Sequence, residues 1–408
     1  MKKRVFLLII AILMLSSCSV DKFPLKNETK IAVPSVTDNS AEFQTAEGML
    51  KKLDYGNFII MQSLGENYFG NISEFKDGEG MVYDEGLVDI KSGKITELSY
   101  PQALPEWHVG SGHTAVLQDR YVYEWKSYTS MFGENTLHDV RLTRVDGRTG
   151  KVEVVDKAEQ LSPFIYLCKI NDTDFLSYTV MPTASEKTEY ATETVASIYN
   201  ISGEKREIIR EKYENAADWT DSEGILIERF AVNDGEIYGI GRRRIDGKYK
   251  FFMYHYSKDG KLIDTKPLEN LENIIGDEQF AEVYLRGEFL AFRTYETLST
   301  YICRISPTGL EITAKGESGV VQYAVSEDKI YYIESTVDQN TGEVVKTDCP
   351  LYEIDTRNGN VREIIFENPI EKPYFVSITA LLNGEIILTY CPDGIYDPMK
   401  MYQYAVIM

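Results

Sequence analysis

The stretch Leu351–Ile365, LYEIDTRNGNVREII, decides the fold, because two runs of alternating hydrophobic and polar residues flank a turn that ends in Gly359. Alternation with a period of two is typical of a β-strand with one buried face. The Asp355 side chain can hydrogen-bond to the backbone of its own turn, and glycine adopts positive φ without steric cost. The stretch therefore predicts an antiparallel β-hairpin.

This hairpin phrase recurs along the chain. Equivalent turns end in Gly93, Gly150, Gly203, Gly260 and Gly309, and successive glycines of this set lie 49 to 57 residues apart. A second kind of turn alternates with the first, near Gly56, Asp119, Asp172, Gly235, Gly287, Asp328 and Gly384. Two hairpins in each repeat give four antiparallel strands, which is one blade of a β-propeller.

We therefore expect an all-β chain that forms a single β-propeller over residues 29–408. Seven turns of the second kind and six of the first predict seven four-stranded blades, and six or eight blades remain alternatives. The last blade lacks an outer hairpin. We expect the segment Glu28–Val36, ETKIAVPSV, to supply its missing outer strand, because closure by an N-terminal strand would cover an open sheet edge.

The repeat wording resembles that of known bacterial propellers. VDIKSGK, VDGRTGK and the second-strand motif Ile330-Tyr331-Tyr332 resemble the repeats of extracytoplasmic propellers of the TolB-like, YncE-like and quinoprotein kinds. Quinoprotein repeats place a tryptophan a few residues after the glycine, where this chain has Leu98, Val155, Ile209 and Ile365. The resemblance therefore does not imply a pyrroloquinoline quinone site, and we expect no cofactor.

The first residues predict an exported protein. Lys2, Lys3 and Arg4 precede an apolar run, Val5–Leu15, that is too short to span a bilayer and is typical of a signal peptide. Leu15-Ser16-Ser17-Cys18 resembles the lipobox of bacterial lipoproteins. The resemblance implies a signal peptide over residues 1–17, diacylation of Cys18, a tether over residues 18–28 and attachment to the extracytoplasmic face of a cell membrane. The sequence leaves open which membrane this is.

Charge limits the classes of partner. The chain has 43 basic and 64 acidic residues and a net charge of −21, and removal of residues 1–17 makes it three units more negative. Such acidity argues against nucleic acid, which requires a basic surface. It also argues against electrostatic docking on anionic lipids, so the bilayer should be a partner only through acylated Cys18.

Few residues point to a specific site. Arginines and exposed aromatic residues are typical anchors of binding surfaces, and the candidates on the blade connectors and on one hairpin are Trp107, His108, Trp219, Arg242, Arg243 and Arg244. The alternatives are packing between blades for the tryptophans and ion pairs for the arginines. His108 and His113 are five residues apart, which is not a zinc-ligand spacing, so we expect no metal site.

The cysteines suggest one cross-link. Cys168 and Cys303 lie within alternating strands and are expected to be small core residues. Cys349 and Cys391 are expected at equivalent hairpins of adjacent blades, and an exported protein can oxidise such a pair. A Cys349–Cys391 disulfide is therefore possible if the Cα atoms lie within about 7 Å of each other.

No catalytic motif is present, so the sequence favours a binding, scaffold or sensor module for a protein or an envelope glycan. The alternative is an extracytoplasmic glycan lyase or hydrolase with its site in the propeller funnel. A scaffold for envelope assembly is a third possibility. The function is expected on the face made by the hairpins between second and third strands and by the connectors between blades.

Overall fold

The computed structural model describes residues 44–76, 80–101, 108–132, 135–158, 165–183, 191–215, 222–316, 321–326, 328–334, 351–370, 374–381, 383–391 and 401–408. These residues belong to one compact unit, Glu42–Met408. Apart from the five-residue helix α2 (Leu271–Ile275), its described elements are β-strands. The prediction of an all-β fold is confirmed.

The described strands form five separate sheets and one eight-stranded sheet. Blade one contains β2 (Phe58–Leu64), β3 (Asn67–Lys76), β4 (Gly80–Asp89) and β5 (Ile95–Glu97). Blade two contains β6 (His108–Leu117), β7 (Tyr121–Phe132), β8 (Asn135–Asp146) and β9 (Val152–Ala158). Blade three contains β10 (Ile165–Lys169), β11 (Asp174–Thr183), β12 (Ala191–Asn200), β13 (Lys205–Asn215) and the short β14 (Ser222–Gly224).

The chain continues with two more separate sheets. Blade four contains β15 (Leu226–Asn233), β16 (Glu236–Ile245), β17 (Lys248–Tyr256) and β18 (Leu262–Pro267). Blade five contains β19 (Phe280–Arg286), β20 (Phe289–Thr294), β21 (Thr300–Ser306) and β22 (Gly309–Gly316).

The eight-stranded sheet consists of two four-stranded halves. Blade six contains β23 (Val321–Val325), β24 (Lys329–Glu334), β25 (Leu351–Asp355) and β26 (Val361–Phe366). Blade seven contains β27 (Tyr374–Ala380), β28 (Ile386–Cys391), β29 (Tyr402–Ile407) and the N-terminal strand β1 (Gln44–Leu53). The halves meet where β26 pairs in parallel with β1. Counted separately, they bring the total to seven blades.

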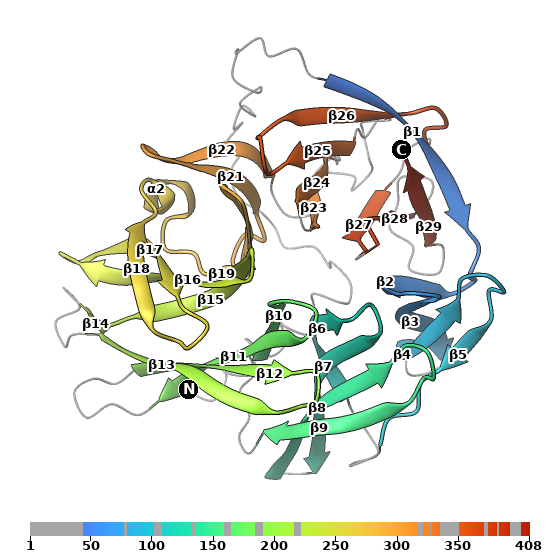
Figure 1. Cartoon of the computed structure of the whole chain (residues 1–408), viewed down its shortest axis with the longest axis horizontal. Coiled ribbons are helices and arrows are strands. Elements are labelled where there is room, and N and C mark those ends of the chain that lie inside the picture. The colour runs from blue at the N-terminus through green and yellow to red at the C-terminus, as the bar shows by residue number, and fades with distance from the viewer. Residues whose placement is uncertain are drawn as a thin grey trace. The chain divides into compact units, whose positions relative to one another are not determined.

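The blades follow one another around a ring (Figure 1), and apolar side chains pack between neighbouring blades. The buried clusters among the described residues number seven, and each spans two successive blades. In one of them, Leu64 and Phe69 of blade one pack with Val122 of blade two. Another joins Phe58 of blade one to Ile387 of blade seven. Because the first and last blades share a core, the described blades form a closed propeller.

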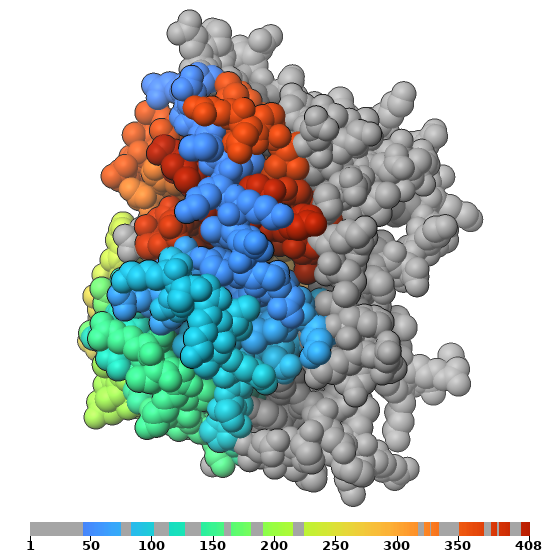
Figure 2. Space-filling model, turned by 90° about the vertical axis from the view of Figure 1, so that its right-hand side faces the viewer, coloured from blue at the N-terminus to red at the C-terminus, as the bar shows by residue number. Residues whose placement is uncertain are grey.

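An N-terminal strand closes the ring, as predicted, but it is a different segment from the one expected. β1 pairs antiparallel with β29, from Met49 opposite Ile407 to Leu53 opposite Gln403. Figure 2 shows β1 in blue on the surface, between the C-terminal blades in orange and red and blade one in cyan. Residues 28–36, to which the sequence assigned this role, lie outside the described residues.

The sequence misassigned the closing strand because of the turn at Gly56. This glycine has φ of 62°. The repeat placed it in the inner hairpin, between the first and second strands of blade one, but it joins β1 to β2, which belong to different sheets. The inner hairpin of blade one turns instead at Gly65, between β2 and β3. The two turns share the same local chemistry, and that chemistry does not determine whether the flanking strands pair with each other. The other inner and outer hairpin turns are where the repeat predicts them.

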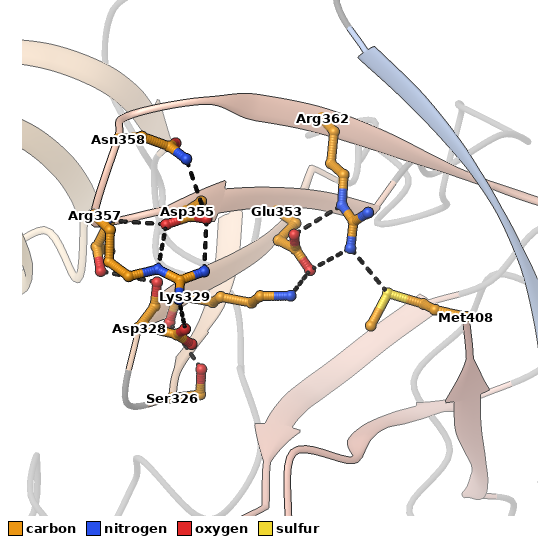
Figure 3. A network of polar contacts seen from close by, with 10 residues as sticks. Ser326, Asp328, Lys329, Glu353, Asp355, Arg357, Asn358, Arg362 and Met408 are labelled. Carbon is orange, nitrogen blue, oxygen red and sulfur yellow. Dashed lines mark hydrogen bonds and ion pairs between the residues drawn. The ribbon is translucent and has the colours of Figure 1, made fainter.

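Both kinds of hairpin turn lie at the same end of blade six (Figure 3). Arg357, on the outer turn, contacts Asp355 of that turn at 2.9 Å and Asp328 of the inner turn at 3.2 Å. Next to them, the buried Glu353 carboxylate forms ion pairs with Lys329 at 3.0 Å and with Arg362 at 2.7 Å. Burial alone would raise the pKa of Glu353, but the hydrogen bonds from Arg362 and Lys329 outweigh it and lower that pKa.

Glycines allow the first two strands of a blade to approach closely. The first strands of blades one, two, four, five and seven contain a β-bulge. Opposite two of these bulges, a Cβ at Gly70 would lie 1.9 Å from the Ile59 carbonyl oxygen, and a Cβ at Gly241 would lie 1.8 Å from that of Leu226. Since no side chain tolerates such contacts, glycine is required there.

Candidate binding face and its polar clusters

One face of the propeller carries the hairpin turns between first and second strands and between third and fourth strands. On the opposite face, the second and third strands of some blades extend beyond the first strand as a two-stranded hairpin, which we call a ribbon. In blade four, β15 begins at Leu226, opposite Arg242, but β16 and β17 stay paired as far as Ile245 and Lys248. The second and third strands of blades one, two and three extend past the first strand in the same way. Each extension is three or four residues, or about 10–13 Å at the usual strand rise.

In the part of the chain that the structure describes, the ribbons occur on some blades and not on others. Within the described residues, the second and third strands of blades five, six and seven do not extend past the first strand. The ribbons therefore project from four consecutive blades on one side of the ring. Residues 65–80, 126–139 and 179–194 span the hairpins of the first three ribbons. Most of these residues belong to the paired strands β3, β4, β7, β8, β11 and β12.

The predicted site residues are distributed unevenly over this face. Trp107 and Trp219 lie outside the described residues, and His108 is the first residue of β6, with a side chain outside the described part. Arg243 and Arg244 lie on the β16–β17 ribbon, where Arg243 is exposed and Arg244 is half-buried. The sequence thus placed the arginines on the correct hairpin.

Arg242, at the base of this ribbon, is buried and ion-paired. Its Nε lies 2.7 Å from Oε1 of Glu228, and Nη1 donates a hydrogen bond to the Asp277 carbonyl at 2.8 Å. The other Glu228 oxygen accepts the Phe280 backbone N–H at 3.1 Å. Through these contacts the pair joins blades four and five. Of the two roles considered for Arg242, a binding anchor or an ion pair, the structure shows the ion pair.

Arg229 forms a second cluster that sequence reasoning missed. It follows the bulge of β15 and is 6% exposed. Its Nε donates to the Ala281 carbonyl at 3.0 Å, Nη2 donates to the Tyr295 hydroxyl at 2.9 Å, and the guanidinium lies 4.2 Å from the Tyr166 ring centroid. The missed signal was a Glu228–Arg229 charge pair inside an apolar strand. This cluster connects blades three, four and five.

Lys126 forms a third cluster, between blades one and two. Its side chain is 1% exposed and contacts Glu124 at 3.0 Å and Glu85 more closely. The Tyr100 hydroxyl donates to Glu85, and the Tyr100 ring centroid lies 4.7 Å from the Lys126 ammonium. Burial, followed by the nearby charge of Glu85, raises the pKa of Glu124 to about 8. Glu124 is thus the carboxyl of this cluster whose protonated form is favoured by burial.

Within the described residues, no group of three or more histidine, cysteine or acidic side chains is arranged to hold a metal ion. Cys303 is fully buried, and burial raises its pKa to about 12, which fits a core residue. Cys391 is buried at the end of β28, whereas Cys349 lies outside the described residues, so their disulfide stays a prediction. Cys18 also lies outside the described residues.

Comparison with known proteins identifies no family. No protein-family model matches the chain, and no curated protein sequence matches it. One similar solved structure is an oligogalacturonate lyase from Vibrio parahaemolyticus, with 11% identity and a TM-score of 0.45 over 89% of this chain and 98% of that chain. Another comes from a study of prolyl endopeptidases, with 12% identity and a TM-score of 0.47 over 82% of this chain and 45% of that chain.

An acylaminoacyl peptidase from Pyrococcus horikoshii is also similar, with 10% identity and a TM-score of 0.36 over 84% of this chain and 58% of that chain. The chain thus spans about half the length of these two peptidases. We draw no activity from such distant similarities. The described part of the chain contains no helix with the length and apolar character needed to cross a membrane. The class defined by the sheets is the β-propeller.

Proposed function

We propose that this chain is an extracytoplasmic propeller lipoprotein, anchored through acylated Cys18, that binds a protein or an envelope glycan and acts as a scaffold or sensor. The observation that carries the proposal is the set of ribbons on four consecutive blades. A ribbon that extends past its blade can contact a second molecule along its length, and the β16–β17 ribbon exposes Arg243, Ile245 and Lys248 at its end.

No such ribbon extends from the opposite face within the residues that the structure describes. Several polar side chains there form hydrogen bonds within their own turns: Asp89 accepts the Ser92 N–H at 2.6 Å, Asn200 accepts the Ser202 N–H at 3.0 Å, and Asp355 accepts the Arg357 N–H at 3.0 Å. These contacts explain the turn residues by structure alone. The ribbon face is therefore the better candidate for binding.

A glycan lyase or hydrolase remains the alternative because of one observation. Glu85, Tyr100, Glu124 and Lys126 lie within hydrogen-bonding distance of one another in series, and Glu124 has a raised pKa, as catalytic acids often do. However, the side chains of Glu85, Glu124 and Lys126 are no more than 10% exposed. A substrate would have to displace neighbouring groups to reach them, so binding is the better-supported function.

Photo-crosslinking in live cells tests the proposal. A photoreactive residue replaces Ile245, which is 39% exposed at the tip of the β16–β17 ribbon. The matched control replaces the exposed Lys94, on a hairpin turn of the opposite face. We expect a discrete crosslinked product at Ile245 and none at Lys94. Equal products at both positions, or none at either, would contradict the proposed binding face.

A further inference from the structure

The β16–β17 ribbon carries a concentration of positive charge in a protein of net charge −21. Over Arg242–Lys250 the chain reads RRRIDGKYK, with five cationic side chains and one acidic residue, Asp246. Two of the cations are neutralised by other elements: Arg242 by Glu228, and Lys250 by Glu272 of α2.

Two cations at the end of the ribbon, Arg243 and Lys248, are exposed. Arg243 and Lys248 form no salt bridge with any residue in the described part of the chain. The register places Arg243 opposite Lys250, and Ile245 opposite Lys248, so these four side chains share one face of the ribbon. Arg243 and Lys248 are diagonal neighbours, about 7–8 Å apart. Like charges so placed repel each other, and an anion between them would relieve that repulsion.

The other face of the ribbon presents an aromatic ring flanked by guanidinium groups. The Tyr249 ring centroid lies 4.2 Å from Cζ of Arg242 and 5.6 Å from Cζ of Arg244. Arg244 also donates a hydrogen bond from Nε to the Gly247 carbonyl at 3.2 Å, which holds it across the turn. A guanidinium can bind the charged group of a sugar while the tyrosine ring beside it packs against the face of the sugar ring.

This chemistry fits a flexible anionic chain better than a folded protein partner. Protein interfaces usually bury an apolar core of aromatic and aliphatic side chains, whereas Ile245 is the large apolar side chain that this ribbon exposes. Charges on both faces of a narrow ribbon can instead follow repeated anionic groups along a polymer.

We propose that the β16–β17 ribbon binds an anionic polysaccharide whose charges are carboxylates or phosphodiesters, with Arg243 and Lys248 as the contacting cations. The proposal rests on the proposed function, because it names the partner of the ribbon face.

A binding experiment with the full chain in neutral detergent tests it. The probes are alginate for carboxylates, phosphomannan for phosphodiesters and dextran as the uncharged control. We expect wild-type protein to bind alginate, phosphomannan or both, more weakly as salt is added, and not dextran. The variant R243E/K248E should bind about tenfold more weakly.

The matched variant is K94E/R148E, which makes the same change in net charge at exposed hairpin turns of the opposite face. It should bind within about twofold of wild type, because distant exposed charges are screened. Equal losses in the two variants would show a general charge effect and overturn the proposal. Both variants change exposed side chains, and an unchanged thermal transition would show that they fold.

Three further results would overturn the proposal: no binding to either anionic polymer, equally tight binding to single-stranded DNA, or tighter binding to anionic lipid vesicles. Binding to alginate alone or to phosphomannan alone would support it and identify the charged group. The crosslinking at Ile245 does not depend on the partner's chemistry. A protein crosslinked there, together with no polysaccharide binding, would overturn this inference and leave the proposed function intact.

Discussion

Replacement of Lys126 by methionine should strongly destabilise the propeller. Lys126 is 1% exposed and is the cation between Glu85 and Glu124 at the junction of blades one and two. Burial and the charge of Glu85 raise the pKa of Glu124 to about 8, which favours the protonated form of Glu124 at neutral pH. The variant K126M therefore leaves the Glu85 carboxylate, 10% exposed, without its cation.

The expected loss is about 3–5 kcal/mol of the free energy of unfolding, as for other buried ion pairs from which one partner is removed. The Coulomb interaction of two unit charges about 4 Å apart, at an effective dielectric constant of about 20, is also about 4 kcal/mol. The double variant K126M/E85Q removes both charges and should regain most of the loss, because no unpaired charge remains.

Urea denaturation at neutral pH, followed by intrinsic fluorescence, measures these differences. The control is K94M, at an exposed turn, which should change the free energy of unfolding by no more than about 0.5 kcal/mol. Two results would refute the reasoning: a loss of less than about 1 kcal/mol in K126M, or a double variant no more stable than K126M.

Three further predictions concern other parts of the chain. C18S should move the protein from the membrane to the soluble fraction on cell fractionation, because it removes the acylation site; retention in the membrane would contradict the proposed anchor. G241A should lose about 1–3 kcal/mol in urea denaturation, because its Cβ would lie 1.8 Å from the Leu226 carbonyl oxygen. The raised pKa of Glu124 means that its protonated form stabilises the fold fully below about pH 4.5 and that this contribution is lost as pH rises through about 8. E124Q should therefore lose less stability than wild type between pH 4.5 and 8, and parallel pH profiles would contradict this.

The repeat could be predicted from the sequence because its turns are local. Gly359 and its equivalents need only positive φ and a nearby Asp, Asn or Ser, and both requirements are visible in a few residues. Gly56 shows the limit of this reasoning. Its turn has the same local chemistry, but β1 pairs with β29 and β26, about 350 and 320 residues away along the chain. Ring closure, and not the turn, determined that pairing.

The polar clusters were harder to predict for a related reason. Glu124 and Lys126 alternate within β7 as ordinary surface residues would, yet they face blade one and become buried. Which side of a strand meets a neighbouring blade depends on the whole ring. By contrast, the arginine run was found because its hairpin lies within one blade, although only the structure shows that Arg242 is buried while Arg243 is exposed.

Hydroxyl-radical footprinting tests the central claim most directly, because it requires no knowledge of the partner. Oxidation of each side chain is compared between intact cells and the purified full chain. A membrane-anchored propeller that binds through its ribbons should show protection in cells at Ile245 and Tyr249, and none at Tyr55 or Ile201, which lie beside the hairpin turns of the opposite face. Equal oxidation of the ribbons in both samples, or protection confined to the turn face, would contradict it.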